Sequence, residues 1–262
     1  MFKKIYYINL EHREDRRNNV EDQLAKINFN GPIERINAAY GKNLNLEIIP
    51  SNLFTREAIE SCTNKKDITN TSSMTKGGMG ISLSQKWIYE KVLCGLEDYA
   101  LILEDDITLP NDFIPKVIDK INSINENFDI LYLGYHVKMN NKIGSLVDYP
   151  SKIWGLFGYI INKKAAKSII EIFPLNKQID TEIPRAFANL KVLALKENER
   201  LITSPSSEES VQFGSDIQFS REKFTNINEN DCNITLIIIA VIVILLTVCL
   251  SCNTKQQRVN FP

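Results

Sequence analysis

Three consecutive carboxylates could do chemistry in this 262-residue chain: Glu104, Asp105 and Asp106. Like charges this close raise one another's pKa values unless a cation or a basic group lies among them. Hard oxygen ligands suit Mg²⁺ or Mn²⁺, and such ions usually lie between one or two carboxylates and the phosphates of a substrate. The alternative is that the three residues only end a strand and open the acidic first turn of a helix. This stretch alone leaves both interpretations open.

The residues before the carboxylates predict where they lie. Residues 100–103 form a short unbroken apolar run, which is typical of a strand buried on both faces. In an open α/β sheet, ligands bind in the crevice beyond the carboxyl ends of the strands. We therefore expect the three carboxylates at the mouth of such a crevice.

Other apolar runs predict an α/β domain over residues 1–219. A strand feeds a helix near the amino terminus, where Val20, Leu24 and Ile27 recur at helical spacing, and a second strand follows. Besides residues 100–103, strands are expected over residues 5–10, 33–38, 128–133, 154–161 and 191–196. Further helices are expected over residues 51–60, 111–124 and 163–173, with Ser51, Asn111 and Asn162 as N-caps.

A glycine-rich segment, Gly77-Gly78-Met79-Gly80, precedes another helical pattern. Free backbone N–H groups at such a helix start could hold a phosphate. The spacing matches neither G-x-G-x-x-G nor a Walker A loop, however, and a plain start of a helix is the favoured interpretation.

Composition limits the classes of partner. The net charge is −1, and the basic residues near the amino terminus alternate with acidic ones, which argues against a nucleic-acid partner. The five cysteines form no disulfide framework and no paired C-x-x-C zinc pattern.

The carboxyl-terminal part predicts a membrane anchor. Residues 234–252 are apolar and uncharged, so we expect a transmembrane helix there, preceded by a polar linker over 220–233 and followed by a short tail over 253–262. A buried core helix is the alternative. The first residues have lysines but no apolar core typical of a signal peptide, so the expected topology is a single-pass C-terminal anchor with the α/β domain in the cytosol. Lys255 and Arg258 beyond the segment argue for the opposite orientation.

Collinear motifs suggest a family. In order they are I-Y-Y-I-N-L-E-H-R-E-D-R at 5–16, I-N-A-A-Y-G-K-N-L at 36–44, G-G-M-G-I-S-L-S at 77–84, L-I-L-E-D-D-I at 101–107, D-I-L-Y-L-G at 129–134, G-Y-I-I-N-K-K-A-A at 158–166, Asp180, and S-D-I at 215–217. Together they resemble glycosyltransferase family 25, the lipooligosaccharide-type sugar transferases and collagen galactosyltransferases. Two positions depart from the family pattern: Gln85 stands where the family has histidine, and Tyr40 where it has aspartate.

The resemblance implies a GT-A fold, a Rossmann-like sheet that binds a nucleotide sugar, here a UDP-sugar. It implies transfer of a hexose, galactose or glucose, with inversion, to a hydroxyl of a glycan, a glycolipid or a protein. Glu104 and Asp106 would hold Mn²⁺ or Mg²⁺ as a D-x-D-type signature. The residues expected to bind the nucleotide are Asn9, Leu10, Arg13, Arg16, Gly80, Ser84 and Asp105.

The acceptor hydroxyl also needs a base, ideally a carboxylate on the opposite face of the sugar. Asp180 is the first candidate and Glu182 the second, although both could simply start a helix. Three other functions remain open. Gln85 and Tyr40 are compatible with a catalytically silent, membrane-tethered binding module, and a structural protein could keep the fold without the metal. A nucleotidyltransferase would instead release pyrophosphate.

Overall fold

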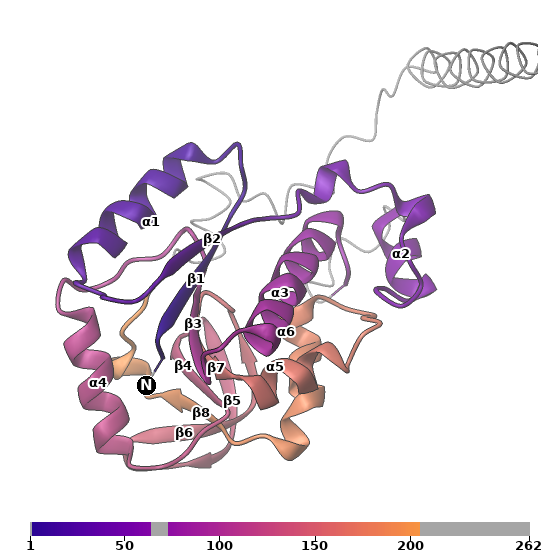
Figure 1. The fold of residues 1–262 in the computed structure, drawn as a ribbon. Helices are drawn as coiled ribbons and strands as arrows, with labels where there is room; N and C mark the ends of the chain where they lie inside the picture. Colours follow the sequence, from indigo (N-terminus) through magenta and orange to yellow (C-terminus); the bar gives the residue numbers. More distant parts are fainter. Residues whose placement is uncertain (1, 64–72, 205–262) are drawn as a thin grey trace, which may run out of the picture. The chain divides into compact units, whose positions relative to one another are not determined.

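The computed structural model describes residues 2–63 and 73–204, and these contain a mixed eight-stranded sheet (Figure 1). The first three strands are parallel, β7 runs antiparallel to β3 and β4, β8 is parallel to β4, and β6 and β5 are antiparallel additions. Across the sheet, the order is β2 (Ile33–Asn37), β1 (Lys4–Asn9), β3 (Tyr99–Leu103), β7 (Gly158–Asn162), β4 (Ile130–Gly134), β8 (Val192–Leu195), β6 (Val147–Trp154) and β5 (Val137–Ile143).

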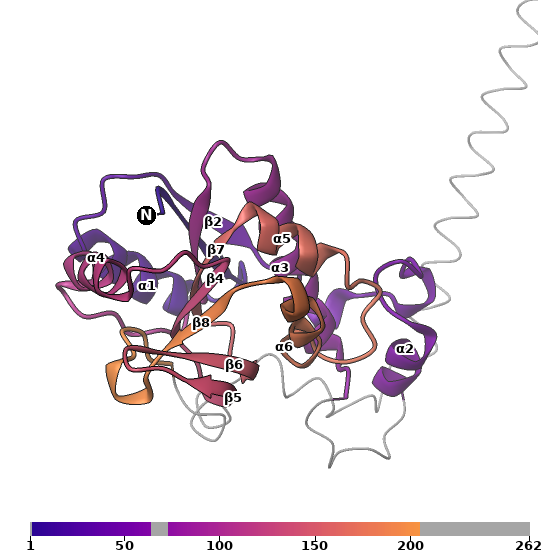
Figure 2. The same cartoon turned by 90° about the horizontal axis from the view of Figure 1, so that it is seen from below.

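Helices cover both faces of the sheet, which makes this a single mixed α/β domain (Figures 1 and 2). One face packs against α1 (Glu14–Lys26) and α4 (Phe113–Ile124). The other packs against α2 (Arg56–Thr63), α3 (Lys76–Cys94), α5 (Lys163–Ile170) and α6 (Ile179–Glu182). Short 3-10 helices cover Gly41–Asn43, Leu46–Ile48, Ile183–Asn189 and Glu197–Glu199.

Side chains of the central strands alternate between two cores. In β3, Leu101 and Leu103 join the core under α1 and α4, whereas Ala100 and Ile102 join the core under α3 and α5. Successive strand residues point to opposite faces, so a strand covered on both sides must be apolar throughout. The central position of β3 therefore explains its unbroken apolar run, which ends at the carboxylates.

The order in which strands are added to the sheet reverses at β1. The crossover from β1 to β2 passes through α1 on one face, and the crossover from β2 to β3 passes through α3 on the other, so β2 and β3 flank β1. In open α/β sheets this reversal opens a crevice beyond the carboxyl ends of the two strands at the switch point. Here those ends are Asn9 and Leu103.

Most predicted elements are confirmed, with two differences among the strands. The predicted strand over residues 154–161 is wrong as one element. These residues contain the end of β6 and most of β7, and the chain bends between them at Gly155, whose φ is +95°. The hairpin of β5 and β6 was missed because the β5 side chains are mostly exposed and polar, so no apolar run marks it. The glycine-rich segment lies inside the start of α3, as favoured, with Thr75 as the N-cap accepting from the Gly78 N–H at 2.9 Å.

Of the three predicted N-caps only Asn162 is confirmed; its Oδ1 accepts a hydrogen bond from the Ala165 N–H at 2.9 Å. Ser51 is wrong because α2 begins at Arg56, and Asn111 is wrong because α4 follows Asp112 without a side-chain cap bond. Several serines, threonines and asparagines precede each apolar pattern, and the tertiary packing selects among them.

The predicted linker, apolar segment and tail, residues 220–262, lie outside the described residues. Within residues 2–63 and 73–204, no helix is long and apolar enough to cross a membrane.

Candidate active site

The acidic turn, Glu104 to Asp106, directly follows β3 at the crevice, as predicted. Its backbone is tied to the neighbouring strand region by a hydrogen bond from the Glu104 N–H to the Phe157 carbonyl at 3.2 Å. Asp105 is buried, whereas Glu104 and Asp106 are half-buried. The three carboxylates therefore occupy different environments although they are adjacent in sequence.

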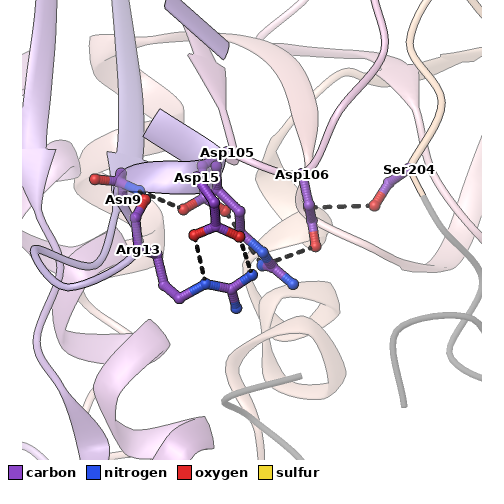
Figure 3. A network of polar contacts seen from close by, with 7 residues as sticks. Asn9, Arg13, Asp15, Asp105, Asp106 and Ser204 are labelled. Carbon is purple, nitrogen blue, oxygen red and sulfur yellow. Dashed lines mark hydrogen bonds and ion pairs between the residues drawn. The ribbon is translucent and has the colours of Figure 1, made fainter. Parts of the chain in front are cut away.

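Asp105 points into the domain and is held from two sides (Figure 3). The Asn9 Nδ2 donates to its Oδ2 at 2.7 Å, and Arg16 Nη1 donates to its Oδ1 at 3.3 Å. Burial raises the pKa of the Asp105 carboxyl, although the Asn9 hydrogen bond and the Arg16 charge oppose the increase. The residue thus joins the acidic turn to the end of β1.

Asp106 connects the acidic turn to the last described residues, 201–204. Its Oδ2 accepts from Arg16 at 3.1 Å and its Oδ1 accepts from the Ser204 hydroxyl at 3.3 Å (Figure 3). That segment is held in place by a hydrogen bond from the Leu201 N–H to the Leu133 carbonyl at 2.9 Å, and by the bridge between Thr108 and Thr203. Arg16 therefore shares its charge between two carboxylates of the turn.

The pKa of Glu104 depends on burial and on the charges of neighbouring carboxylates. Burial raises its pKa well above 4.5, and the charges of Asp106, Asp105 and Asp180 raise it further, against a smaller lowering by Arg16. The charge of Asp180, on α6, therefore acts on Glu104. The first candidate base and the predicted metal residues thus interact electrostatically.

The two candidate bases differ in their surroundings. Asp180 is half-buried, and burial raises its pKa despite hydrogen bonds from Thr181. Glu182 is buried and both of its oxygens are engaged, one by the Lys177 N–H at 3.0 Å and the other by Arg185 Nη1 at 2.8 Å. Glu182 therefore holds its own helix together, and Asp180 is the better placed of the two.

Of the predicted nucleotide-binding residues, Asn9, Arg16 and Asp105 come together and the others make different contacts. The Leu10 carbonyl accepts from the Arg13 N–H at 2.9 Å. The Arg13 guanidinium forms two hydrogen bonds with the Asp15 carboxylate, at 2.9 and 2.8 Å, and these lower the pKa of Asp15 to about 2. Leu10 and Arg13 therefore shape the loop after β1.

Gly80 and Ser84 contact the loop of residues 39–41. The Ser84 hydroxyl accepts from the Ala39 N–H at 2.9 Å and donates to the Gly80 carbonyl at 2.8 Å. A Cβ on Gly80 would lie 2.4 Å from the Ala39 carbonyl oxygen, so only glycine allows this approach. The contacts of both residues pack α3 against this loop, and their role in nucleotide binding stays a prediction.

A buried polar group near Glu104 was not predicted as part of the site. The hydroxyls of Tyr89 and Tyr159 lie 2.8 Å apart, and Tyr159 donates to Gln85 Oε1 at 2.7 Å. Burial raises the pKa of both tyrosines, and the charge of Glu104 adds to the increase. The only sequence signal was that Gln85 departs from the family pattern.

The structure also places His136 near the acidic turn, beside the residue that the Glu104 N–H contacts. Its ring lies 4.8 Å from that of Phe157. Burial lowers the pKa of His136, the charge of Arg200 lowers it further, and the charge of Asp106 raises it. Its position beside Gly134 at the end of β4 was the available signal.

The carboxylate oxygens of Glu104 and Asp106 are the donors at this site that suit a divalent cation. Among the described residues, no group of three or more His, Cys, Asp or Glu side chains is arranged to hold a metal ion by itself. An ion here would need further ligands from a bound molecule, as Mg²⁺ usually does.

Comparison with solved structures adds little. The glycosyltransferase GlyE of Streptococcus pneumoniae matches 74% of this chain and 45% of its own, with 12% identity and a TM-score of 0.39. We draw no conclusion about this chain from a similarity at that level.

Comparison with known sequences identifies the family. Procollagen galactosyltransferase 2 of Homo sapiens is 26% identical over 75% of this chain and 32% of its own length, and a glycosyltransferase 25 family member of Aedes aegypti is 29% identical over 71% and 31%. A probable inactive glycosyltransferase 25 family member 3 of Bos taurus is 22% identical over 69% and 31%. The chain spans about a third of the length of these relatives. The profile of glycosyltransferase family 25 (LPS biosynthesis protein) matches residues 2–183, and the chain belongs to this family.

Proposed function

We propose that this protein is a GT-A-type glycosyltransferase that moves a hexose, galactose or glucose, from a UDP-sugar to a hydroxyl of a glycan, a glycolipid or a protein. The observation that carries the proposal is the contact of Arg16 with the acidic turn at the switch-point crevice of a family 25 chain. That crevice is where an α/β sheet binds its ligand.

The acidic cluster fits a divalent cation, Mn²⁺ or Mg²⁺. The pKa of Glu104 is raised by burial and then by three neighbouring carboxylates, so the site has more negative charge than Arg16 compensates. Glu104 and Asp106 would hold the ion, together with the phosphates of the donor. When bound, it supplies Lewis-acid stabilisation of the charge on the leaving nucleoside diphosphate.

Asp180 is the proposed base of a single inverting displacement. Its carboxylate takes the proton of the acceptor hydroxyl while that oxygen attacks C1, and the C1–O bond electrons leave with the diphosphate. Burial raises the pKa of Asp180, which makes its carboxylate a stronger proton acceptor than an exposed aspartate. Arg16, beside Asp106, would add positive charge near the leaving phosphates.

A catalytically silent nucleotide-binding module is the alternative function. Arg16 already forms ion pairs with both Asp105 and Asp106, as it could in a site that has lost its metal. The Bos taurus relative described as probably inactive shows that the family resemblance can persist without assigned activity.

A donor screen separates these functions. The full chain is incubated with a panel of nucleotide sugars, with and without Mn²⁺, and released sugar and nucleoside diphosphate are measured. We expect Mn²⁺-dependent release from one UDP-hexose. Nucleotide binding without release would favour the silent module, and release of pyrophosphate from a nucleoside triphosphate would favour a nucleotidyltransferase.

We also propose that residues 234–252 span a membrane once, as a C-terminal anchor, and that the catalytic domain faces the cytosol. The apolar and uncharged composition of the segment supports the span. The cysteines of the sequence form no disulfide framework, which suits a reducing compartment.

A further inference from the structure

Arg35 lies on β2, and β1 separates this strand from β3 and its acidic turn. No sequence signal marked this residue. In the register of the sheet it is the partner of Tyr7 on β1. Its Nε donates to the side-chain oxygen of Asn9 at 3.0 Å. Its Nη2 is buried and has no hydrogen-bond partner among the described residues. A buried donor atom without a hydrogen-bond partner costs stability, so its presence requires an explanation.

The hydrogen bond from Arg35 determines how the Asn9 amide is oriented. An arginine side chain has only donors, so the atom of Asn9 that faces it must be the oxygen. The Asn9 NH₂ group therefore faces the opposite way, where it donates to Asp105 Oδ2 at 2.7 Å and to the Arg13 carbonyl at 3.1 Å. The reverse orientation would place an amide oxygen against a carboxylate and a carbonyl, which repel it.

Water cannot easily replace these contacts. Asn9 is 1% exposed and Asp105 is 7% exposed, so a donor lost from either residue leaves a buried acceptor unsatisfied. Asp105 lies between Glu104 and Asp106, and its side chain is the anchor of the acidic turn. Two arginines therefore act on this turn: Arg16 by direct contact, and Arg35 through Asn9.

We propose that Arg35 is a positioning residue, which orients the Asn9 amide so that Asp105 holds the acidic turn in the arrangement that binds the nucleotide and its divalent cation. The inference rests on the proposed function. It deepens that function by assigning a role to a side chain outside the carboxylate cluster.

Binding of UDP in the presence of Mn²⁺, measured by calorimetry on the full chain in detergent, tests the inference. We expect Arg35→Met to weaken binding by about 10- to 100-fold, the usual effect of losing a residue that orients a ligand-binding group. Arg56→Met is the matched control, because the Arg56 side chain is 88% exposed at the start of α2, and it should bind like the wild type.

A double-mutant cycle distinguishes positioning from a general loss of structure. Because Arg35 acts through Asn9, Arg35→Met should change the affinity by less than about twofold in an Asn9→Ala background. An equal loss in both backgrounds would show that Arg35 acts independently of Asn9 and would overturn the inference. If Arg35→Met lacks a cooperative thermal transition, Arg35→Lys, which keeps the charge but not the planar guanidinium, takes its place in the cycle with the same expectation.

The same measurement separates the inference from the function on which it rests. Wild-type protein that binds no UDP with Mn²⁺ would overturn the proposed function and the inference with it. Wild-type protein that binds UDP, with an Arg35→Met variant that binds equally well, would overturn the inference alone.

Discussion

Adjacent carboxylates perform different tasks in the acidic turn. Asp105 is buried and used by the fold, since both of its oxygens accept hydrogen bonds from Asn9 and Arg16. Glu104 and Asp106 are half-buried and remain within reach of a ligand. The middle carboxylate therefore anchors the turn, whereas the two outer ones stay partly exposed.

We predict that Asp106→Ala abolishes Mn²⁺-dependent donor hydrolysis while leaving the thermal transition largely unchanged. The variant removes a proposed metal ligand, and relief of repulsion within the cluster offsets the lost contacts with Arg16 and Ser204, so little stability should be lost. Hydrolysis of UDP-hexose and melting by circular dichroism measure the two effects. Asp112→Ala, which removes an exposed carboxylate on the α4 side, is the control. Full activity in Asp106→Ala would remove the metal role from this residue.

Asp180→Asn and Glu182→Gln should separate catalysis from structure. We expect Asp180→Asn to keep UDP binding but to lower turnover by about 100-fold or more, the usual contribution of a general base. Glu182→Gln loses the charge that holds Arg185 and should lower the melting temperature with turnover retained. Turnover at saturating donor and UDP affinity are measured for both. Unchanged turnover in Asp180→Asn would reassign the base.

The pH dependence of turnover should report the raised pKa of Asp180. Burial stabilises the protonated form, so this residue stays protonated at pH values where an ordinary aspartate, with a pKa of 3.8, is already ionised. A base must be ionised to act, so turnover should rise with pH through the raised pKa. Turnover at saturating donor and Mn²⁺ over about pH 4 to 8 shows this limb. The limb should be absent in Asp180→Asn, and its persistence there would contradict the assignment.

At the scale of elements, family motifs include residues that join elements as well as residues of the site. Asp129, the first residue of the D-I-L-Y-L-G motif, accepts hydrogen bonds from Asn162 at 2.9 Å, Lys164 at 2.8 Å and the Lys191 N–H at 2.8 Å. It thereby connects the starts of β4, α5 and β8. This motif supports the sheet whose edge carries the site.

The contact of α3 with the loop of residues 39–41 predicts a difference between two glycines of one helix. We expect Gly80→Ala to lower the free energy of unfolding by roughly 1–3 kcal/mol, because its Cβ would meet the Ala39 carbonyl at 2.4 Å. In Gly78→Ala the nearest atom, at 3.2 Å, belongs to the flexible Gln178 side chain, so the loss should be smaller. Urea unfolding measures both. Equal losses would show that the close approach of this loop is unimportant.

At the scale of the whole molecule, the site depends on the reversal of strand order at β1. That reversal places α1 and α3 on opposite faces and leaves the ends of β1 and β3 open between them. Residues from α1, the acidic turn and the stretch that carries Ser204 can then meet at one edge of the sheet.

The proposed anchor predicts where the domain lies in a eukaryotic cell. Full-length protein should remain in the membrane fraction, and the sequon Asn70-Thr71-Ser72 should stay unmodified, because only lumenal sequons are glycosylated. Mass shifts upon glycosidase treatment measure this, with Asn70→Gln as the control. A glycosidase-sensitive shift that disappears in Asn70→Gln would place the domain in the lumen and refute the cytosolic orientation.

The sequence by itself determined the α/β class, most strands, the helical start of α3 and the position of the acidic turn at the end of β3. Those features depend on local signals, namely apolar periodicity and the residues that follow an apolar run. Only the tertiary structure decided that the charge of Asp180 acts on Glu104, that Glu182 is engaged elsewhere, and that Arg35 contacts Asn9. These relations join residues distant in the chain, and they follow from strand order and register, which local spacing does not encode.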